Sequence, residues 1–201
     1  MNTTVTDFYS NDKVENCPKL NIPEYAFIGR SNVGKSSLIN LLLNQKVAYT
    51  SSKPGKTQLI NHIIVENNWA LVDLPGYGYA KLSKSERHKI LTRNRKYFTN
   101  RGLPLVAVFM LIDIRIPPQK IDLEKMEWLV ENNIYFIRIF TKSDGLKKNK
   151  VVKSIREYDD CMQNNHWEKI PETIVTSSKK NIGKMKVLNR IKELNSLFQN
   201  I

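Results

Sequence analysis

The segment GRSNVGKSS at residues 29–37 constrains the fold more than any other part of the chain. Its spacing of glycine, four residues, glycine, lysine and serine is that of a phosphate-binding loop, or P-loop. The apolar run at residues 25–28 predicts a buried strand, and the leucine-rich run at residues 38–43 predicts an amphipathic helix. Because strand, loop and helix follow in the order that the motif requires, a plain glycine turn is the weaker interpretation.

The residue types in this loop suit phosphate chemistry. Gly29 and Gly34 let backbone N–H groups turn toward phosphate oxygens without a side chain in the way. Lys35 supplies a point charge for the outer phosphates, and the Ser36 hydroxyl is a suitable ligand for Mg²⁺. The expected nucleotide contacts in this loop are Gly29, Arg30, Ser31, Asn32, Val33, Gly34, Lys35, Ser36 and Ser37.

Length and composition are typical of one globular domain, since 41 % of the 201 residues are apolar. We expect a single domain over residues 22–201 and an N-terminal extension over residues 1–21, whose order the sequence leaves open. The longest apolar run, residues 105–112, is far too short to span a bilayer, and the N-terminus has no apolar signal core. These features predict a monomer in the cytoplasm or in an organelle lumen, without a membrane partner. Cys17 and Cys161 lie far apart and predict free thiols.

The charge of the chain is strongly basic, with 32 Lys and Arg against 19 Asp and Glu and a net charge of +13. Residues 81–101 hold eight cationic residues and one acidic residue, Glu86, and a second basic region covers residues 179–186. Such clustering favours a polyanionic partner, nucleic acid above all, although a solvated helix face is the alternative. The candidate RNA-binding residues are Lys84, Arg87, Lys89, Arg93, Arg95 and Lys96.

Hydrophobic patterning predicts that strands and helices alternate along the rest of the chain. The predicted strands are residues 59–65 and 69–72, which form a hairpin, then 103–112, 134–140 and 173–176; the predicted helices cover residues 83–99, 120–131, 148–164 and the C-terminal stretch. In the first of these helices, the expected inner stripe is Ile90, Leu91, Tyr97 and Phe98. This alternation predicts an α/β fold of three layers, a mostly parallel sheet flanked by helices, with ligands at the carboxyl ends of the strands.

Two motifs at later strand ends point to guanine. The Asp144 carboxylate can accept hydrogen bonds from both N1–H and N2–H₂ of guanine, whereas adenine lacks this pair of donors. Lys142 is expected to lie along the base and to brace the P-loop. At the next strand end, we expect the Ser178 N–H to meet guanine O6 and the Lys179 stem to form a second wall. The candidate base contacts are Thr141, Lys142, Asp144, Thr176, Ser177, Ser178 and Lys179; capping or turn roles are the alternative.

The segment DLPG at residues 73–76 and the segment PGKT at residues 54–57 are expected to sense the γ-phosphate. Asp73 would hold a water on Mg²⁺, the Gly76 N–H would meet the γ-phosphate, and Thr57 would give Mg²⁺ a second hydroxyl. Loss of the γ-phosphate would release both loops, as in the switch of GTPases. The expected catalytic residues are Lys35, Thr57 and Gly76; the expected Mg²⁺ ligands are Ser36, Thr57 and, through water, Asp73; the remaining expected nucleotide contacts are Pro54, Gly55, Lys56, Leu74 and Pro75.

Taken in order, these motifs resemble those of Ras-like P-loop GTPases of the translation-factor-related class and, more narrowly, those of the EngB (YihA/YsxC) family of ribosome-biogenesis GTPases. The narrower resemblance rests on GRSNVGKSSLIN, TSSKPGKTQLIN, LVDLPGYGYAK, DIRIPPQKIDLEKMEWL, TKSD and TSS, which cover most of residues 22–180. It implies a GTP- and GDP-binding domain that assists assembly of the large ribosomal subunit. Residues 1–20 and the last helix match only loosely.

One position departs from Ras-type switches. Where those proteins place a water-orienting glutamine after the glycine of the switch loop, this chain has Tyr77. We therefore expect slow intrinsic GTP hydrolysis. The resemblance implies a substitute, a K⁺ ion held near Asn32, against the alternative that Asn32 only supports the loop. Tyr77 and Tyr79 are either aromatic residues that stack on RNA bases or residues that pack in the core.

Other functions remain open on the sequence alone. A regulatory GTPase that acts on protein partners, for example in cell division, is the main alternative, although the chain has no terminal lipidation cysteine and carries basic clusters. A septin-like assembly protein would need further interface segments or a coiled-coil tail. A metabolic enzyme would need a second substrate site, and the sequence indicates none. The basic helix after the 73–76 loop therefore favours a GTP-dependent RNA contact.

Overall fold

A central sheet of seven strands organises the computed structural model, which describes residues 3–48, 59–78, 82–165 and 167–199. The strands lie in the order β1-β3-β4-β2-β5-β6-β7, and the pairs formed by β2, β4, β5, β6 and β7 are parallel. The strands are β1 (Val5–Asn11), β2 (Glu24–Gly29), β3 (Ile60–Val65), β4 (Trp69–Asp73), β5 (Leu105–Asp113), β6 (Phe136–Thr141) and β7 (Thr173–Val175). The expected mostly parallel sheet is therefore confirmed.

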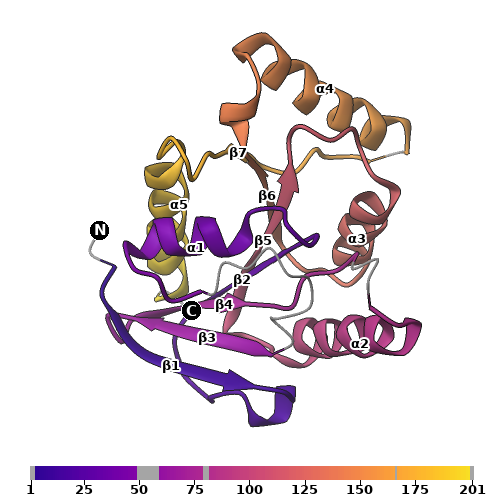
Figure 1. The fold of residues 1–201 in the computed structure, drawn as a ribbon. Coiled ribbons are helices and arrows are strands. Elements are labelled where there is room, and N and C mark those ends of the chain that lie inside the picture. Colours follow the sequence, from indigo (N-terminus) through magenta and orange to yellow (C-terminus); the bar gives the residue numbers. More distant parts are fainter. Residues whose placement is uncertain (1–2, 49–58, 79–81, 166, 200–201) are drawn as a thin grey trace.

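Helices cover both faces of the sheet and form the two outer layers (Figure 1). The helices are α1 (Lys35–Leu43), α2 (Lys84–Asn100), α3 (Lys120–Glu131), α4 (Lys148–Asn164) and α5 (Lys184–Phe198), with short 3₁₀ turns at Val14–Asn16 and Ser143–Gly145. One core cluster joins α1 and α5 to the sheet, and the other joins α2, α3 and α4 to its opposite face. Because both faces are covered, the central strands are nearly continuous apolar runs.

Strand β1 was not predicted from the sequence. It pairs antiparallel with β3, from Val5 opposite Val65 to Asn11 opposite Ile60. Its side chains are mostly exposed, with Phe8 at 46 % and Tyr9 at 41 %. A strand whose side chains are exposed on both faces shows no hydrophobic alternation, so the sequence pattern does not predict it. Part of the expected N-terminal extension is therefore a strand of the sheet.

The buried stripe of α2 differs from the predicted one at Leu91, which is 39 % exposed. Ile90 and Asn94 are four residues apart, and the stripe continues through Tyr97 and Phe98, so these residues share the inner face. Leu91 lies one residue, about 100°, away from Ile90 on the helix. The prediction that Leu91 is an inner residue was therefore wrong, and the buried Asn94 takes a place in the stripe.

The carboxyl end of α2 is held to the sheet by a buried carboxylate. Glu24 on β2 accepts hydrogen bonds from the Tyr97 hydroxyl (2.7 Å) and from the Arg101 guanidinium. Burial raises the pKa of Glu24, but the bonds from Arg101 and His62 outweigh burial and lower this pKa to about 2. Arg101 is one of the eight cationic residues of the basic segment at residues 81–101. Its contact with Glu24 makes it a structural residue and not part of an exposed cationic surface.

Candidate functional site

Most of the predicted nucleotide contacts within the described residues lie at the carboxyl ends of the parallel strands. The five parallel strands β2, β4, β5, β6 and β7 end at Gly29, Asp73, Asp113, Thr141 and Val175. All the motifs that the sequence analysis singled out within the described residues begin at or directly after these strand ends. The topology therefore brings together segments that lie far apart in the sequence.

The P-loop has the backbone conformation that its glycines permit. Gly34 has φ 102° and caps α1, and Asn32 has φ 61°. At Gly29, an added Cβ would lie 2.9 Å from the Leu111 carbonyl oxygen and 2.9 Å from Val33 Cγ1, so this position accepts only glycine without a shift of neighbours. Helix α1 begins directly after this loop, and a helix amino terminus favours an anion.

Lys35 and Asp73 meet at the phosphate end of the site. The Lys35 Nζ donates a hydrogen bond to Asp73 Oδ1, and both side chains are more than nine-tenths buried. This contact brings the P-loop lysine and the carboxylate at the end of β4 together, as a site for phosphate and a cation requires. The Ser36 hydroxyl on α1 and the Asp73 carboxylate are hard oxygen donors, which suit Mg²⁺.

Residues 74–77 follow β4 and run along the P-loop. Leu74 donates its N–H to the Phe27 carbonyl (3.1 Å), Tyr77 donates to the Gly29 carbonyl (3.2 Å), and Ser31 donates to the Tyr77 carbonyl (3.0 Å). The loop that is expected to sense the γ-phosphate is therefore held by its backbone to strand β2 before Gly76 and to the P-loop after it.

Tyr77 points into the core, not toward solvent. It is 3 % exposed, and its hydroxyl donates to Asp122 Oδ1 on α3 (2.8 Å). The same carboxylate accepts from Arg30 Nε of the P-loop (3.0 and 3.2 Å) and from the Tyr158 hydroxyl (3.4 Å). Of the two interpretations of Tyr77, core packing holds and RNA stacking does not. Tyr79 lies outside the described residues.

Asp122 was missed by the sequence analysis, although it is the hub of this network. Asp122 is fully buried, and burial raises the pKa of its carboxyl group. The hydrogen bonds from Tyr77 and Arg30 lower this pKa but do not outweigh burial. An acidic residue in the first turn of a helix ordinarily serves as a favourable helix-end charge. Only the three-dimensional contacts reveal that Asp122 links α3 to the two loops.

Lys142 braces the P-loop, as predicted. Its Nζ donates to the Asn32 carbonyl and pairs with Asp113 Oδ2 at the end of β5 (2.9 Å). The neighbouring Thr141 hydroxyl donates to the Val33 carbonyl (2.6 Å). The end of β6 is thus joined to the P-loop by two hydrogen bonds.

Asp113 is a second residue that sequence reasoning missed. It accepts from Arg115 Nε (2.9 Å) and Nη2 (2.8 Å) as well as from Lys142. Burial raises the pKa of Asp113, but the bonds from Arg115 and Lys142 outweigh burial and lower the pKa to about 2. The signal in the sequence is a carboxylate that ends a long apolar strand. This carboxylate stays ionised at neutral pH and fixes Lys142.

The proposed guanine contacts lie on two adjacent loops. Asp144 is exposed, and its carboxylate accepts a hydrogen bond from the Ser177 hydroxyl, which lowers the pKa of Asp144. Ser143 donates its N–H to the Thr176 carbonyl (3.1 Å), so the loops after β6 and β7 are directly joined. Ser178 is half-buried and Lys179 is exposed beside them. An ionised, exposed carboxylate suits a ligand with two N–H donors.

The remaining predictions fall on three regions. Pro54, Gly55, Lys56 and Thr57 lie outside the described residues. Asn32 is exposed on the P-loop and has a positive φ. Ser31 is half-buried, and its hydroxyl bonds the Tyr77 carbonyl (3.3 Å). The candidate RNA residues all lie on α2, which begins with a capping box formed by Ser83 and Glu86.

A groove of about 450 Å³ separates the 76–78 loop from α2 and α3. Its lining residues are Gly76, Tyr77, Gly78, Lys84, Arg87, His88, Ile90, Leu91 and Ile121. Leu91 and Ile121 are about 40 % exposed, whereas Lys84 and Arg87 carry positive charge. The groove therefore has an apolar wall beside cationic groups, next to the loop expected to respond to nucleotide.

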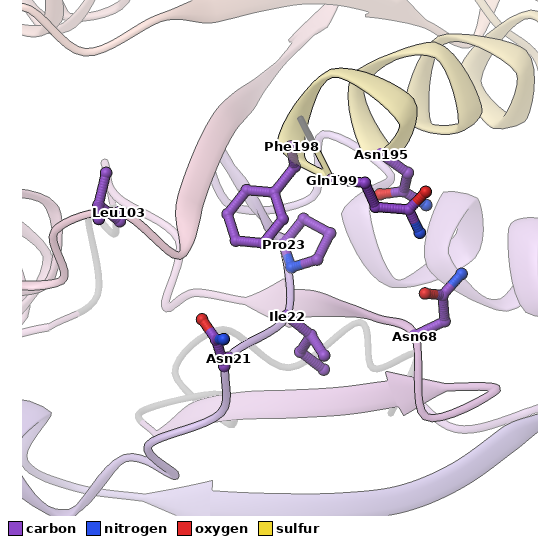
Figure 2. Close-up of a pocket in the computed structure, with 8 residues that line it drawn as sticks. All are labelled: Asn21, Ile22, Pro23, Asn68, Leu103, Asn195, Phe198 and Gln199. Carbon is purple, nitrogen blue, oxygen red and sulfur yellow. The ribbon is translucent and has the colours of Figure 1, made fainter. Parts of the chain in front are cut away.

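A second hollow, of about 490 Å³, lies at the opposite end of β2 from the P-loop. Figure 2 shows its lining, to which the segment before β2, the β3–β4 turn, Leu103 and the end of α5 contribute. Its lining residues are Asn21, Ile22, Pro23, Asn68, Leu103, Asn195, Phe198 and Gln199, none of which is charged. Its position and neutral lining separate it from the phosphate-binding edge.

Among the described residues, no helix is long and apolar enough to cross a membrane. Cys17 and Cys161 are free thiols, as predicted.

Comparison with known proteins gives one consistent result. A family described as 50S ribosome-binding GTPase matches residues 24–142. A probable GTP-binding protein EngB of Flavobacterium johnsoniae is 52 % identical over 193 residues, which are 95 % of this chain and 91 % of that protein. The protein of the same name from Phocaeicola vulgatus is 51 % identical over 187 residues, 92 % of each chain.

Solved structures agree with the sequence comparisons. The crystal structure of a probable GTP-binding protein engB is similar with a TM-score of 0.71 and 26 % identity, covering 86 % of this chain and 98 % of that one. Era in complex with MgGDPNP and nucleotides 1506–1542 of 16S ribosomal RNA has a TM-score of 0.66 and 20 % identity over 87 % of this chain and 57 % of that one. The likeness to Era concerns the fold alone.

Proposed function

The chain belongs to the 50S ribosome-binding GTPase family and, within it, to the EngB proteins, and on that premise we propose that it is a GTP-dependent switch that assists assembly of the large ribosomal subunit by binding ribosomal RNA. Membership in this family carries GTP binding and GTPase activity with it. The ribosomal RNA partner, the slow hydrolysis and the residue roles are the parts that we propose.

At the phosphate end, Lys35 and the N–H groups of the P-loop bind the phosphates, and Gly76 meets the γ-phosphate. Ser36 and, through water, Asp73 would hold Mg²⁺, which would supply positive charge that neutralises the phosphates. The Lys35–Asp73 contact supports these roles, because it brings the lysine of the P-loop and the carboxylate at the end of β4 together. Thr57 remains a proposed second Mg²⁺ ligand from the sequence motif alone.

At the base end, Asp144 accepts the two N–H donors of guanine, and Lys142 and Lys179 lie along the ring. The ionised state of Asp144, favoured by its hydrogen bond from Ser177, supports this selectivity. A site with an ionised carboxylate would leave that group unpaired with adenine, which is a costly mismatch.

Hydrolysis is proposed to be slow because the side chain at position 77, a tyrosine, cannot orient the attacking water. Tyr77 is buried, and its hydroxyl is committed to Asp122. A K⁺ ion near Asn32 would complete the charge around the phosphates. Exchange of K⁺ for Na⁺ at constant ionic strength tests this: a fall in the GTPase rate with unchanged GDP affinity supports the K⁺ role, and an equal rate in both salts contradicts it.

The observation that carries the RNA proposal is the position of α2, whose cationic side chains begin directly after the loop expected to sense the γ-phosphate. Lys89, Arg93 and Lys96 recur at spacings of four and three residues, so they share one face of the helix. Lys84 and Arg87 line the groove instead, and Arg95 lies over the Trp128 ring at 5.5 Å. The RNA contact is therefore expected to centre on the face of Lys89 and Lys96.

Co-sedimentation with purified large ribosomal subunits tests this function. The wild type is compared with a non-hydrolysable GTP analogue and with GDP, at two salt concentrations. We expect retention with the analogue that persists at the higher salt. Equal retention in both nucleotide states that vanishes with salt would mean non-specific binding to RNA and would contradict the proposal.

Two charge-matched variants locate the contact. Reversal of Lys89, Arg93 and Lys96 to glutamate should weaken retention and reduce the salt slope by roughly two to three, while GDP affinity is unchanged. The control reverses three exposed lysines at the start of α4, Lys147, Lys148 and Lys150, and removes the same charge. If both variants lose retention equally, net charge and not the α2 face is responsible.

The apolar wall of the groove favours a second candidate function, a regulatory GTPase that acts on a protein partner. Leu91 and Ile121 would then contact the partner directly. Nuclease treatment of the large subunits separates the two candidates, since a contact through a ribosomal protein survives digestion of exposed RNA.

A further inference from the structure

Asn94 is an unusual residue for its place in the fold. It lies in the middle of α2, it is fully buried, and it takes a position in the apolar stripe between Ile90 and Phe98. Asparagine is disfavoured in a helix interior, and burial of a carboxamide is unfavourable unless the group is hydrogen-bonded. A leucine would fill this position with fewer costs, so the carboxamide calls for an explanation other than packing.

The Asn94 side chain bonds the loop expected to sense the γ-phosphate. Its Nδ2 donates to the Pro75 carbonyl oxygen at 2.8 Å, and both groups are buried. Its Oδ1 is buried without a hydrogen-bond partner in the described part of the chain. Half of the carboxamide is thus committed to the loop, and the other half is an acceptor that a displaced loop N–H could use.

Pro75 immediately precedes Gly76, whose N–H is expected to meet the γ-phosphate. On the other side of Gly76, Tyr77 donates its N–H to the Gly29 carbonyl of the P-loop. Gly76 is therefore held between the P-loop and α2. A shift of Gly76 toward or away from a phosphate must also shift the Pro75 carbonyl, and with it the bond to Asn94.

The carboxyl end of α2 cannot follow such a shift freely. Tyr97 and Arg101 both bond the buried Glu24 on the central strand β2. If Asn94 moves with the loop, we therefore expect the amino-terminal half of α2, residues 84–93, to move more than its carboxyl end. That half carries Lys89 and begins the face that we expect to bind RNA.

We propose that Asn94 is the positioning residue that passes the nucleotide-dependent movement of the 73–76 loop to the amino-terminal half of α2. This inference rests on the proposed function for its consequence, which is that the RNA-binding face is presented differently with GTP and with GDP. The coupling itself requires only a nucleotide and this chain.

Hydrogen exchange of α2 amides in the full chain, with a non-hydrolysable GTP analogue and with GDP, measures the coupling without any RNA. In the wild type, we expect residues 84–93 to exchange at different rates in the two states. Asn94→Leu should abolish that difference while leaving GDP affinity within about twofold. A wild type with equal exchange in both states, or an Asn94→Leu variant that keeps the difference, would overturn the proposal.

Two further variants separate coupling from stability. Tyr97→Phe removes another buried hydrogen bond of α2, one turn later and away from the loop. Because Arg101 still holds the carboxyl end of the helix to Glu24, this variant should keep the nucleotide-dependent difference. Asn94→Ala removes the donor to the Pro75 carbonyl without adding bulk, and it replaces Asn94→Leu if the latter fails to fold. Loss of the difference in Tyr97→Phe as well would show that general stability, not Asn94, carries the effect.

Co-sedimentation with large subunits then distinguishes this inference from the proposed function. If α2 responds to nucleotide through Asn94 but the wild type is not retained, the RNA function fails and the coupling stands. If the wild type is retained only with the analogue and Asn94→Leu is retained equally in both states, both stand. If Asn94→Leu keeps the preference for the analogue, the coupling through Asn94 is refuted while the function stands.

Discussion

Tyr77→Phe removes a single buried hydroxyl and tests whether the Asp122 network holds the loop expected to sense the γ-phosphate. In the wild type this hydroxyl donates to Asp122 Oδ1 at 2.8 Å, and Asp122 is fully buried. The variant leaves the carboxylate with its bonds from Arg30 and a long one from Tyr158. The ring itself still fills its place in the core, so no cavity is created and the lost hydrogen bond is the main change.

A hydrogen bond to a buried charged group contributes about 1.5–3 kcal/mol to stability. For a chain of this size, each kcal/mol corresponds to roughly 2–4 °C in Tm, so Tyr77→Phe should lower Tm by about 3–12 °C. The control is Tyr135→Phe, where the hydroxyl donates to Glu172 (3.3 Å) and accepts from Arg190 (2.9 Å) at an exposed position. That change should lower Tm by less than about 2 °C, because exposed polar contacts contribute little. Differential scanning calorimetry of both variants measures the two values.

The pH dependence gives this prediction a second readout. Burial raises the pKa of Asp122 above its unfolded value, and the Tyr77 bond opposes that shift, so its loss raises the pKa further. A carboxyl group with a raised pKa binds more protons when folded, and stability therefore falls as pH rises through that pKa. The deficit of Tyr77→Phe should be smallest in acid and grow with pH. A Tm within about 1 °C of the wild type at pH 8, or a deficit that grows toward acid, would refute this reasoning.

Three further predictions follow from the other contacts. Arg101→Leu leaves Glu24 buried without its main partner and should lower the free energy of unfolding, measured in urea, by about 3–5 kcal/mol. In the wild type, the stability that Glu24 contributes should be lost as pH falls from about 4.5 toward about 2. An unfolding free energy that does not change over this pH range would contradict the pairing. Lys142→Met should weaken the binding of a fluorescent GDP by at least about tenfold, whereas wild-type affinity should not change between pH 5 and 8 on account of Asp113, whose pKa is about 2. Gly29→Ala places a Cβ 2.9 Å from a β5 carbonyl oxygen, so it should reduce both Tm and GDP affinity; normal values for both would contradict the close approach.

Hydrophobic periodicity and local signals were sufficient to predict most elements of this fold. The capping box at Ser83 and the hairpin between β3 and β4 are decided by residues a few positions apart, and both were found as predicted. The P-loop was also predicted locally, because its spacing is dictated by phosphate chemistry, and the proposed role of Asp144 rests on a local motif as well. The strand order, in contrast, depends on which apolar faces pack together, and the sequence only limits the choices.

The contacts that sequence analysis missed join residues far apart in the chain. Asp122 accepts hydrogen bonds from Arg30 and Tyr77, which lie 92 and 45 residues away in the sequence. No local pattern distinguishes it from an ordinary acidic residue in the first turn of a helix. Asn94 interrupts an apolar stripe, so the pattern predicted Leu91 as an inner residue in its place. A buried polar residue violates the hydrophobic periodicity that predicts helices, and its reason lies in a partner that only the fold brings near.

The pairing of β1 with β3 sets an order of events during synthesis. Val5 leaves the ribosome about 60 residues before its partner Val65. At a translation rate of about 5–20 residues per second, the first strand waits on the order of 3–12 s for the strand that it must join. During that interval Phe8 and Tyr9 belong to a nascent chain with no sheet to receive them. Strand β1, at one edge of the sheet, is thus the first of the seven strands to be made and cannot be among the first to be placed.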